Sequence, residues 1–248
     1  MSTVNLLAAG GAERPPTIMR ERLQPLLQRF RVLGDASEAE LAVLVAGLSE
    51  PVRQPVGQDI LADAAPHGSA FLLKGWAASV RLLRDGRRQV LRLIVPGDLV
   101  GRGAGAGVNG GRIVALTPVE TTSAGAAVEA AWQSSHSGLR RALACGIQAD
   151  EQLLLDQITR LGRLSGAERL ADLLLELRDR LALVGLGDRH RFPMPLTQDV
   201  IADALGLSIV HVSRLKGELG GMGLLHLRAG MAVLPDPQRL ANLACRGA

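Results

Sequence analysis

A single glycine divides LTQDVIADALGLSIVHVSRL, residues 196–215, into two short helical patterns, and this break constrains the fold more than any other feature. Thr197 is a good helix N-cap, because its hydroxyl accepts a hydrogen bond from the first turn. Gly206 readily adopts the positive φ that ends a helix, and Ser208 is the N-cap type for a second one. The sequence therefore predicts a helix over residues 198–205, a tight turn, and another helix from Ser208 onward.

The spacing of three residues in this stretch is typical of a helix-turn-helix. Ala202 lets the two helices approach, Gly206 makes the turn, and Val212 packs between the helices. Downstream, GLLHLRAGMAVLPD contains two short apolar runs around Ala229-Gly230, which is the pattern of a β-hairpin wing. An ordinary helical hairpin followed by a terminal β-hairpin is the alternative, but the combination favours a winged helix-turn-helix.

Between about residues 52 and 128, short apolar runs alternate with turn residues. Asp85-Gly86 predicts a hairpin with a type I′ turn, because this turn needs a positive φ that Gly tolerates. Apolar residues alternate with Arg81 and Arg92 on the two sides, which indicates antiparallel strands with one apolar face. Several short strands at this spacing indicate a small barrel or jelly roll.

The region before these strands contains one clear helical pattern. Residues 1–20 are rich in Gly, Ala and Pro, and we expect them to form a disordered tail. Ser37, followed three residues later by Glu40, forms a capping box, and an apolar stripe at helical spacing follows it.

Residues 138–165 place apolar side chains at near-heptad intervals and predict one long helix. A helix of this length with an apolar stripe needs a partner surface, which is either its own barrel or the same helix of a second subunit. We expect the second arrangement. The expected dimer interface consists of Leu143, Ile147, Leu154, Ile158 and Leu161. A further helix begins near Ser165.

The composition excludes several classes of protein. The two cysteines, Cys145 and Cys245, match neither a zinc site nor a disulfide framework, so we expect no metal site and no iron–sulfur cluster. The sequence lacks the nucleophile and phosphate-loop motifs of common enzymes, and we expect no catalytic site. It shows no secretory signal and no apolar run near about 18 residues, so we expect a cytoplasmic protein without a membrane partner. The net charge of +4 and the pI of about 10.0 mildly favour an acidic partner such as DNA.

Three segments extend this interpretation to nearly the whole chain: LLKGWAASVRLLRDGRRQVLRLIVPGDLVG, RLSGAERLADLLLEL and LTQDVIADALGLSIVHVSRL. With them the chain resembles the Crp/Fnr family of bacterial transcription regulators. The resemblance implies an α+β fold with an N-terminal β-roll (a jelly roll of the cyclic-nucleotide-binding type), a long dimerisation helix and a C-terminal winged helix-turn-helix. The expected boundaries are the tail at 1–20, an effector-type β-roll at 21–130, the dimerisation helix at 131–163 and the DNA-binding domain at 164–248.

The resemblance also implies a function. The second helix of the motif enters the major groove, and a homodimer places two copies about one helical turn apart on a pseudo-palindromic site. Arg214 is expected to bond a guanine edge with both arms of its guanidinium. The expected base contacts are Arg214, Ser213, His211 and Val210, and the expected backbone contacts are Thr197, Gln198 and Ser208. The expected partners are double-stranded DNA, a second copy of the chain and RNA polymerase.

The β-roll lacks the residues with which family members bind cyclic AMP. Arg102 stands where the ribose-binding Glu is expected, and Asn109-Gly110 stand where an Arg–Ser or Arg–Thr pair binds the phosphate. Cyclic AMP is therefore not the expected ligand, and the effector is unidentified. The residues expected to line an effector pocket are Gly97, Asp98, Leu99, Arg102 and Arg112. The alternative function is a small-molecule-binding signalling module whose DNA binding is vestigial.

Overall fold

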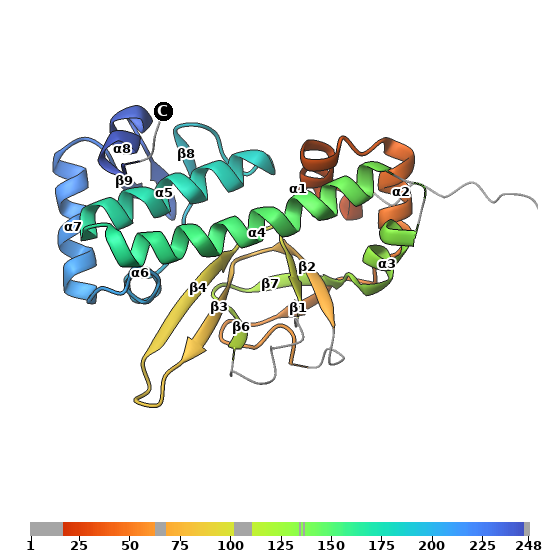
Figure 1. Ribbon diagram of the computed structural model, residues 1–248, viewed down its shortest axis with the longest axis horizontal. Helices are drawn as coiled ribbons and strands as arrows, with labels where there is room; N and C mark the ends of the chain where they lie inside the picture. Colours follow the sequence, from red (N-terminus) through yellow and green to blue (C-terminus); the bar gives the residue numbers. More distant parts are fainter. Residues whose placement is uncertain (1–16, 63–67, 102–110, 134, 136, 246–248) are drawn as a thin grey trace, which may run out of the picture.

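The computed structural model describes residues 17–62, 68–101, 111–133, 135 and 137–245. The long helix α4 (Ser137–Arg163) crosses the molecule, with a β-roll beneath its middle and a winged helix-turn-helix at its C-terminal end (Figure 1). Helices α1 (Thr17–Gly34), α2 (Glu38–Ala46) and α3 (Gly125–Gln133) gather at the opposite end. Helices and antiparallel sheets are mixed, which confirms the expected α+β class.

Within the described residues, two antiparallel sheets form the β-roll, with the strand orders β1-β7-β2-β5 and β4-β3-β6. The strands are β1 (Val52–Gln54), β2 (Ser69–Lys74), β3 (Ala77–Leu82), β4 (Arg88–Ile94), β5 (Leu99–Gly101), β6 (Gly111–Ala115) and β7 (Val119–Ser123). Ile60, Leu72, Ile94 and Val119 belong to the apolar core of the roll. The roll therefore has its own buried interior beneath α4.

The hairpin expected at Asp85-Gly86 joins β3 to β4, but its turn differs from the prediction. Gly86 has a φ of +86°, whereas Asp85 does not adopt a positive φ. A type I′ turn requires positive φ at both central residues, so that part of the prediction is wrong. The loop is longer: the Leu83 N–H donates to the Arg87 carbonyl (2.7 Å) and the Gly86 N–H donates to the Leu83 carbonyl (3.1 Å).

Helices α1 to α3 pack on the N-terminal half of α4 and on the roll. Helix α1 begins at Thr17, inside the segment expected as a tail, while residues 1–16 lie outside the described residues. Leu26 and Phe30 of α1 share one buried cluster with Leu139 and Leu143 of α4. One face of this half of α4 is therefore covered within its own subunit.

The capping box of α2 is confirmed, and it also reaches α4. One oxygen of the Glu40 carboxylate accepts hydrogen bonds from the backbone N–H and hydroxyl of Ser37, both at 2.8 Å. The other oxygen accepts the N–H of Gly138, at the start of α4, also at 2.8 Å. These hydrogen bonds, led by that from the Ser37 backbone, lower the pKa of Glu40 from 4.5 to about 2.

The C-terminal unit packs directly on the β-roll. It contains α5 (Gly166–Leu183), α6 (Gln198–Leu205), α7 (Ile209–Gly221), α8 (Pro237–Leu243), and a sheet of order β8-β10-β9 formed by Arg191–Pro193, Met231–Val233 and His226–Arg228. Val90 and Leu93 of β4 lie in the same buried cluster as Leu174 of α5 and Ile201 of α6. The roll and the helix-turn-helix thus share one apolar core.

Buried ion pairs reinforce this junction. The fully buried Asp98 carboxylate lies 3.0 Å from Arg29 on α1, 3.2 Å from Arg92 on β4 and 2.5 Å from Arg180 on α5. Burial raises the pKa of Asp98, but the attraction of Arg180, Arg92 and Arg29 outweighs it and holds the pKa well below its ordinary value. Arg180 also pairs with Glu176 at 2.9 Å. One aspartate therefore connects the first helix, the roll and the first helix of the C-terminal unit.

Candidate nucleic-acid interface

Helices α6 and α7 form the helix-turn-helix that the sequence predicts. The Thr197 hydroxyl accepts the N–H of Val200 (3.3 Å) and the Ser208 hydroxyl accepts the N–H of His211 (3.2 Å), so both N-caps are confirmed. Gly206 ends α6 with a φ of +64°. One face of α7, which carries Val212, Leu215 and Leu219, is buried in the shared core. This packing fixes which face of α7 points outward.

The outward face of α7 carries three of the four expected base-contact residues. Val210 is 79% exposed, and Ser213 and Arg214 are exposed beside it. These residues are three and four positions apart, so they share one face of the helix. The Arg214 Nε lies 3.6 Å from the Glu218 carboxylate. An exposed pair of this kind contributes little, so the guanidinium is available to a base edge.

His211 is placed differently from the expectation. Its side chain is half-buried, and a methyl group built on Gly166 would lie only 3.1 Å from its Nε2. The ring therefore packs against the first turn of α5, where it supports the position of α7. With its ring against α5, His211 is less open to a base edge than the neighbouring Ser213 and Arg214.

The expected backbone contacts lie at the two helix N-termini, where exposed N–H groups and the helix dipole favour phosphate. Thr197 and Ser208 are exposed, and Gln198 is half-buried next to Thr197. Each capping hydroxyl accepts a bond from its own helix and keeps its O–H free to donate to a phosphate oxygen. The geometry therefore suits both hydroxyls to the DNA backbone.

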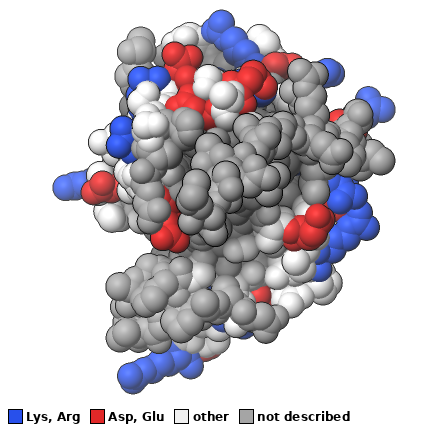
Figure 2. Space-filling model, turned by 90° about the vertical axis from the view of Figure 1, so that its right-hand side faces the viewer, with Lys and Arg blue, Asp and Glu red and all other residues white. Residues whose placement is uncertain are grey.

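The wing adds residues that were not singled out from the sequence. His226 and Arg228 on β9 are exposed, and the turn after them has φ values of +50° at Ala229 and +75° at Gly230. The sequence signal that could have identified these wing residues is Arg228, which directly precedes the turn at Ala229-Gly230. At the opposite end of the molecule, Figure 2 shows acidic and basic side chains interspersed on the surface.

The exposed part of the stripe on α4 begins at Ile147, before the middle of the helix, and continues into its C-terminal half. Ile147, Leu154, Leu155 and Ile158 are 54%, 45%, 50% and 67% exposed. Leu143, expected in the interface, is instead buried against α1, so its assignment is corrected to the core of its own subunit. Leu161 is half-buried, and its Cδ2 lies 3.5 Å from where a Cβ on Gly206 would stand.

The four expected effector residues that the structure describes have different surroundings. Arg102 lies outside the described residues. Asp98 is fully buried and its carboxylate is paired with three arginines, so it is not open to a ligand. Its assignment to an effector pocket is therefore also corrected. Arg112 on β6 faces Asp59 at 3.6 Å, and Gly97 forms a turn with a φ of +92° close to α1. Leu99 lines a cavity of about 30 Å³ between α1 and α4 that also contacts Phe71.

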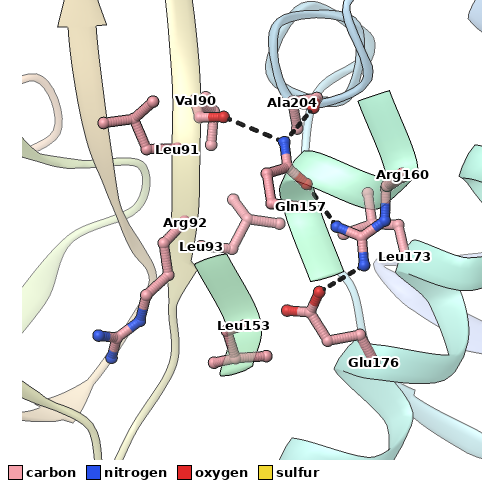
Figure 3. A pocket seen from close by; sticks show the side chains of 10 residues that line it. All are labelled: Val90, Leu91, Arg92, Leu93, Leu153, Gln157, Arg160, Leu173, Glu176 and Ala204. Carbon is pink, nitrogen blue, oxygen red and sulfur yellow. Dashed lines mark hydrogen bonds and ion pairs between the residues drawn. The ribbon is translucent and has the colours of Figure 1, made fainter. Parts of the chain in front are cut away.

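A second cavity lies where β4, α4, α5 and α6 meet (Figure 3). Its volume is about 10 Å³, which is room for about one water molecule. Gln157 points into this junction and bonds to the Val90 and Ala204 carbonyls, and Arg160 bonds to Gln157 and Glu176 (Figure 3). The region is a junction between elements and too small for an organic ligand.

Comparisons with known proteins agree with this geometry. Residues 168–243 match the family model of the Crp-like helix-turn-helix domain. The nitrogen fixation regulation protein FixK of Bradyrhizobium diazoefficiens is 35% identical over 178 residues, which are 70% of this chain and 72% of FixK. FixK of Rhizobium meliloti is 30% identical over 189 residues, 75% of this chain and 83% of the relative. The structure of FixK2 from Bradyrhizobium japonicum matches with a TM-score of 0.66 and 27% identity, and covers 80% of this chain and 98% of FixK2.

The β-roll, the long helix and the open recognition face define a DNA-binding transcription regulator. The chain belongs to the Crp/Fnr family of these regulators. In the part of the chain that the structure describes, no helix has the length and apolar character to span a membrane. Among the same residues, no group of three or more His, Cys, Asp or Glu side chains is arranged to hold a metal ion.

Proposed function

We propose that the chain acts as a homodimer that reads a pseudo-palindromic DNA site, with α7 of each subunit in the major groove. The observation that carries this proposal is the open face of α7, with Val210, Ser213 and Arg214, opposite its buried face. Arg214 suits a guanine O6 and N7, Ser213 a neighbouring base or phosphate, and Val210 a thymine methyl. The proposed backbone contacts are Thr197, Gln198, Ser208 and, on the wing, Arg228.

The exposed stripe on α4 supports the proposed dimer. Four large apolar side chains lie open on one stretch of helix, and contiguous exposed apolar surface marks interaction sites. The helix-turn-helix lies at the C-terminal end of α4 (Figure 1). A twofold axis along α4 therefore brings two copies of α7 to the same end of the dimer, which a palindromic site requires.

The alternative, a signalling module with vestigial DNA binding, is not favoured. The caps, the turn and the open face of α7 are all retained, and the relatives named above are regulators. RNA polymerase is proposed as a further partner from family membership alone. The ligand of the β-roll, if it binds one, is not identified by the residues that the structure describes.

Sedimentation velocity tests the dimer. We expect the wild-type chain to sediment as a dimer and Leu154→Asp/Ile158→Asp to sediment as a monomer that loses site-specific DNA binding. The control is Leu82→Asp, because Leu82 is similarly exposed (53%) but lies on the β3–β4 hairpin. A double variant that stays dimeric places the interface elsewhere. A wild-type monomer that binds its site overturns the homodimer.

A further inference from the structure

The carbonyl groups in the last turn of α6 need hydrogen-bond donors from elsewhere, because the final carbonyls of a helix have no partner within that helix. The Ala202 carbonyl is satisfied locally, since it accepts the N–H groups of Gly206 and Leu207. The three carbonyls that follow it, those of Asp203, Ala204 and Leu205, belong to the end of α6 and have no further turn to supply donors.

Side chains from outside the helix-turn-helix supply all three missing donors. The bonds are Gln89 to the Asp203 carbonyl (2.8 Å), Gln157 to the Ala204 carbonyl (2.7 Å) and Arg169 to the Leu205 carbonyl (2.9 Å). Gln89 lies on β4 of the roll, Gln157 on α4, and Arg169 on α5. The end of α6 is therefore held by each of the three units that surround it.

The donor from the roll does not act alone. Arg88, next to Gln89 on β4, pairs with the Asp203 carboxylate at 2.5 Å. Strand β4 thus contacts both the side chain and the carbonyl of the same α6 residue. Gln89 also donates to the carbonyl of Val90 at 2.9 Å, which restricts where its amide points.

The other two donors are held by further hydrogen bonds of their own. The Gln157 Oε1 accepts from Arg160, which also pairs with Glu176 (Figure 3). Arg160 is only 2% exposed and pairs with Asp172 as well. Arg169 donates to three carbonyls at once, since it also bonds Leu161 at the end of α4 (2.9 Å) and Leu164 just beyond it (2.8 Å). Its guanidinium therefore joins the end of α4 to the end of α6.

We propose that Gln89, Gln157 and Arg169 are positioning residues that fix the angle of the helix-turn-helix relative to α4. Helix α7 follows α6 after a short turn at Gly206, so any rotation of α6 moves the recognition helix with it. Strand β4 then transmits a change in the roll to α7 through the last turn of α6. This inference rests on the proposed homodimer, because the angle sets the distance between two half-sites.

The held arrangement leaves the recognition face open. Val210, Ser213 and Arg214 are exposed while all three contacts to α6 are made. The contacts are therefore compatible with DNA binding, and their loss weakens binding to a site of fixed half-site spacing.

The test uses two variants that remove one donor each. Gln89→Met keeps the length of the side chain but removes its N–H groups, and Gln157→Glu keeps the acceptor for Arg160 but replaces the donating amide. The matched control is Gln54→Met, because the Gln54 amide donates to the Ile60 carbonyl (3.2 Å) inside the roll. Fluorescence anisotropy measures Kd for the selected DNA site and for the same site with two base pairs inserted between its halves.

We expect wild type and Gln54→Met to discriminate strongly between the two spacings. Gln89→Met and Gln157→Glu should bind the original site about tenfold more weakly, since each removes the short hydrogen bond to one carbonyl of α6. Both should lose most of the discrimination while sedimenting as dimers. A merely structural loss lowers both affinities in proportion and leaves their ratio unchanged.

The inference is overturned if either variant keeps the wild-type ratio of the two Kd values, or if either variant binds the original site more tightly than wild type. If wild type itself does not distinguish its site from unrelated duplex, the proposed function fails, and the inference falls with it.

Discussion

Replacing Asp98 by Asn tests how strongly the β-roll is joined to the rest of the molecule. Asn keeps the size of the side chain but removes the charge that faces Arg29, Arg92 and Arg180, whose side chains are only 11%, 13% and 10% exposed. Removing one partner of a buried ion pair costs about 3–5 kcal/mol. Asp150 and Glu176 still face Arg92 and Arg180, so we expect the lower end, a loss of about 3 kcal/mol.

Urea denaturation followed by circular dichroism measures this loss. The control is Asp85→Asn on the exposed hairpin, which should leave the free energy of unfolding close to that of wild type. The folded-state pKa of Asp98 is depressed, so its contribution is present above the unfolded value of 3.8 and is lost as the pH falls below it. The gap between wild type and Asp98→Asn should therefore shrink below that pH. A loss of less than about 1 kcal/mol at neutral pH would refute this account of the junction.

The remaining predictions concern DNA reading, the turn and the α2 cap. Arg214→Ala should cost about 1–3 kcal/mol at the selected site and relax specificity at one base pair, measured by anisotropy; an equal loss on all sequences argues against base contact. Gly206→Ala should destabilise the fold by about 1–2 kcal/mol, because its φ is +64°. Gly217→Ala, inside α7 with open space around it, should stabilise the fold by up to about 1 kcal/mol. Urea denaturation in which both glycine variants are destabilised, or both are stabilised, would contradict this reasoning. Glu40→Gln should cost about 1 kcal/mol at neutral pH. This difference in the free energy of unfolding should narrow as the pH falls from 4.5 toward about 2, where wild-type Glu40 protonates. Thermal melts that show the same difference at every pH would count against the capping role.

The helix-turn-helix was predictable because its signals are local. Thr197, Gly206 and Ser208 each specify a helix end through their own backbone and side chain, and the fold keeps all three. Helix α1 was not predicted, because Pro25 lies inside it and it follows a Gly- and Pro-rich segment. The apolar side chains of α1 pack on α4 and the roll, and this packing stabilises the helix. A local sequence pattern does not reveal contacts of this kind.

The candidate site was predictable only where it is formed by one segment. The stripe on α4 is continuous in sequence, but α1 covers its first part, so Leu143 is core while Ile158 is open. His211 has the right spacing for a base contact, yet packing against Gly166 turns its ring inward. Gln89 meets α6 across 114 residues of chain, and a contact of that kind leaves no periodic pattern to recognise.

Selection of binding sites from random duplex DNA by the purified full-length chain tests the central claim most directly. A dimeric reader with α7 in the major groove should enrich an inverted repeat whose half-sites are centred about one helical turn apart. Enrichment of a single half-site, or of no sequence, would contradict the claim that two recognition helices read the DNA together.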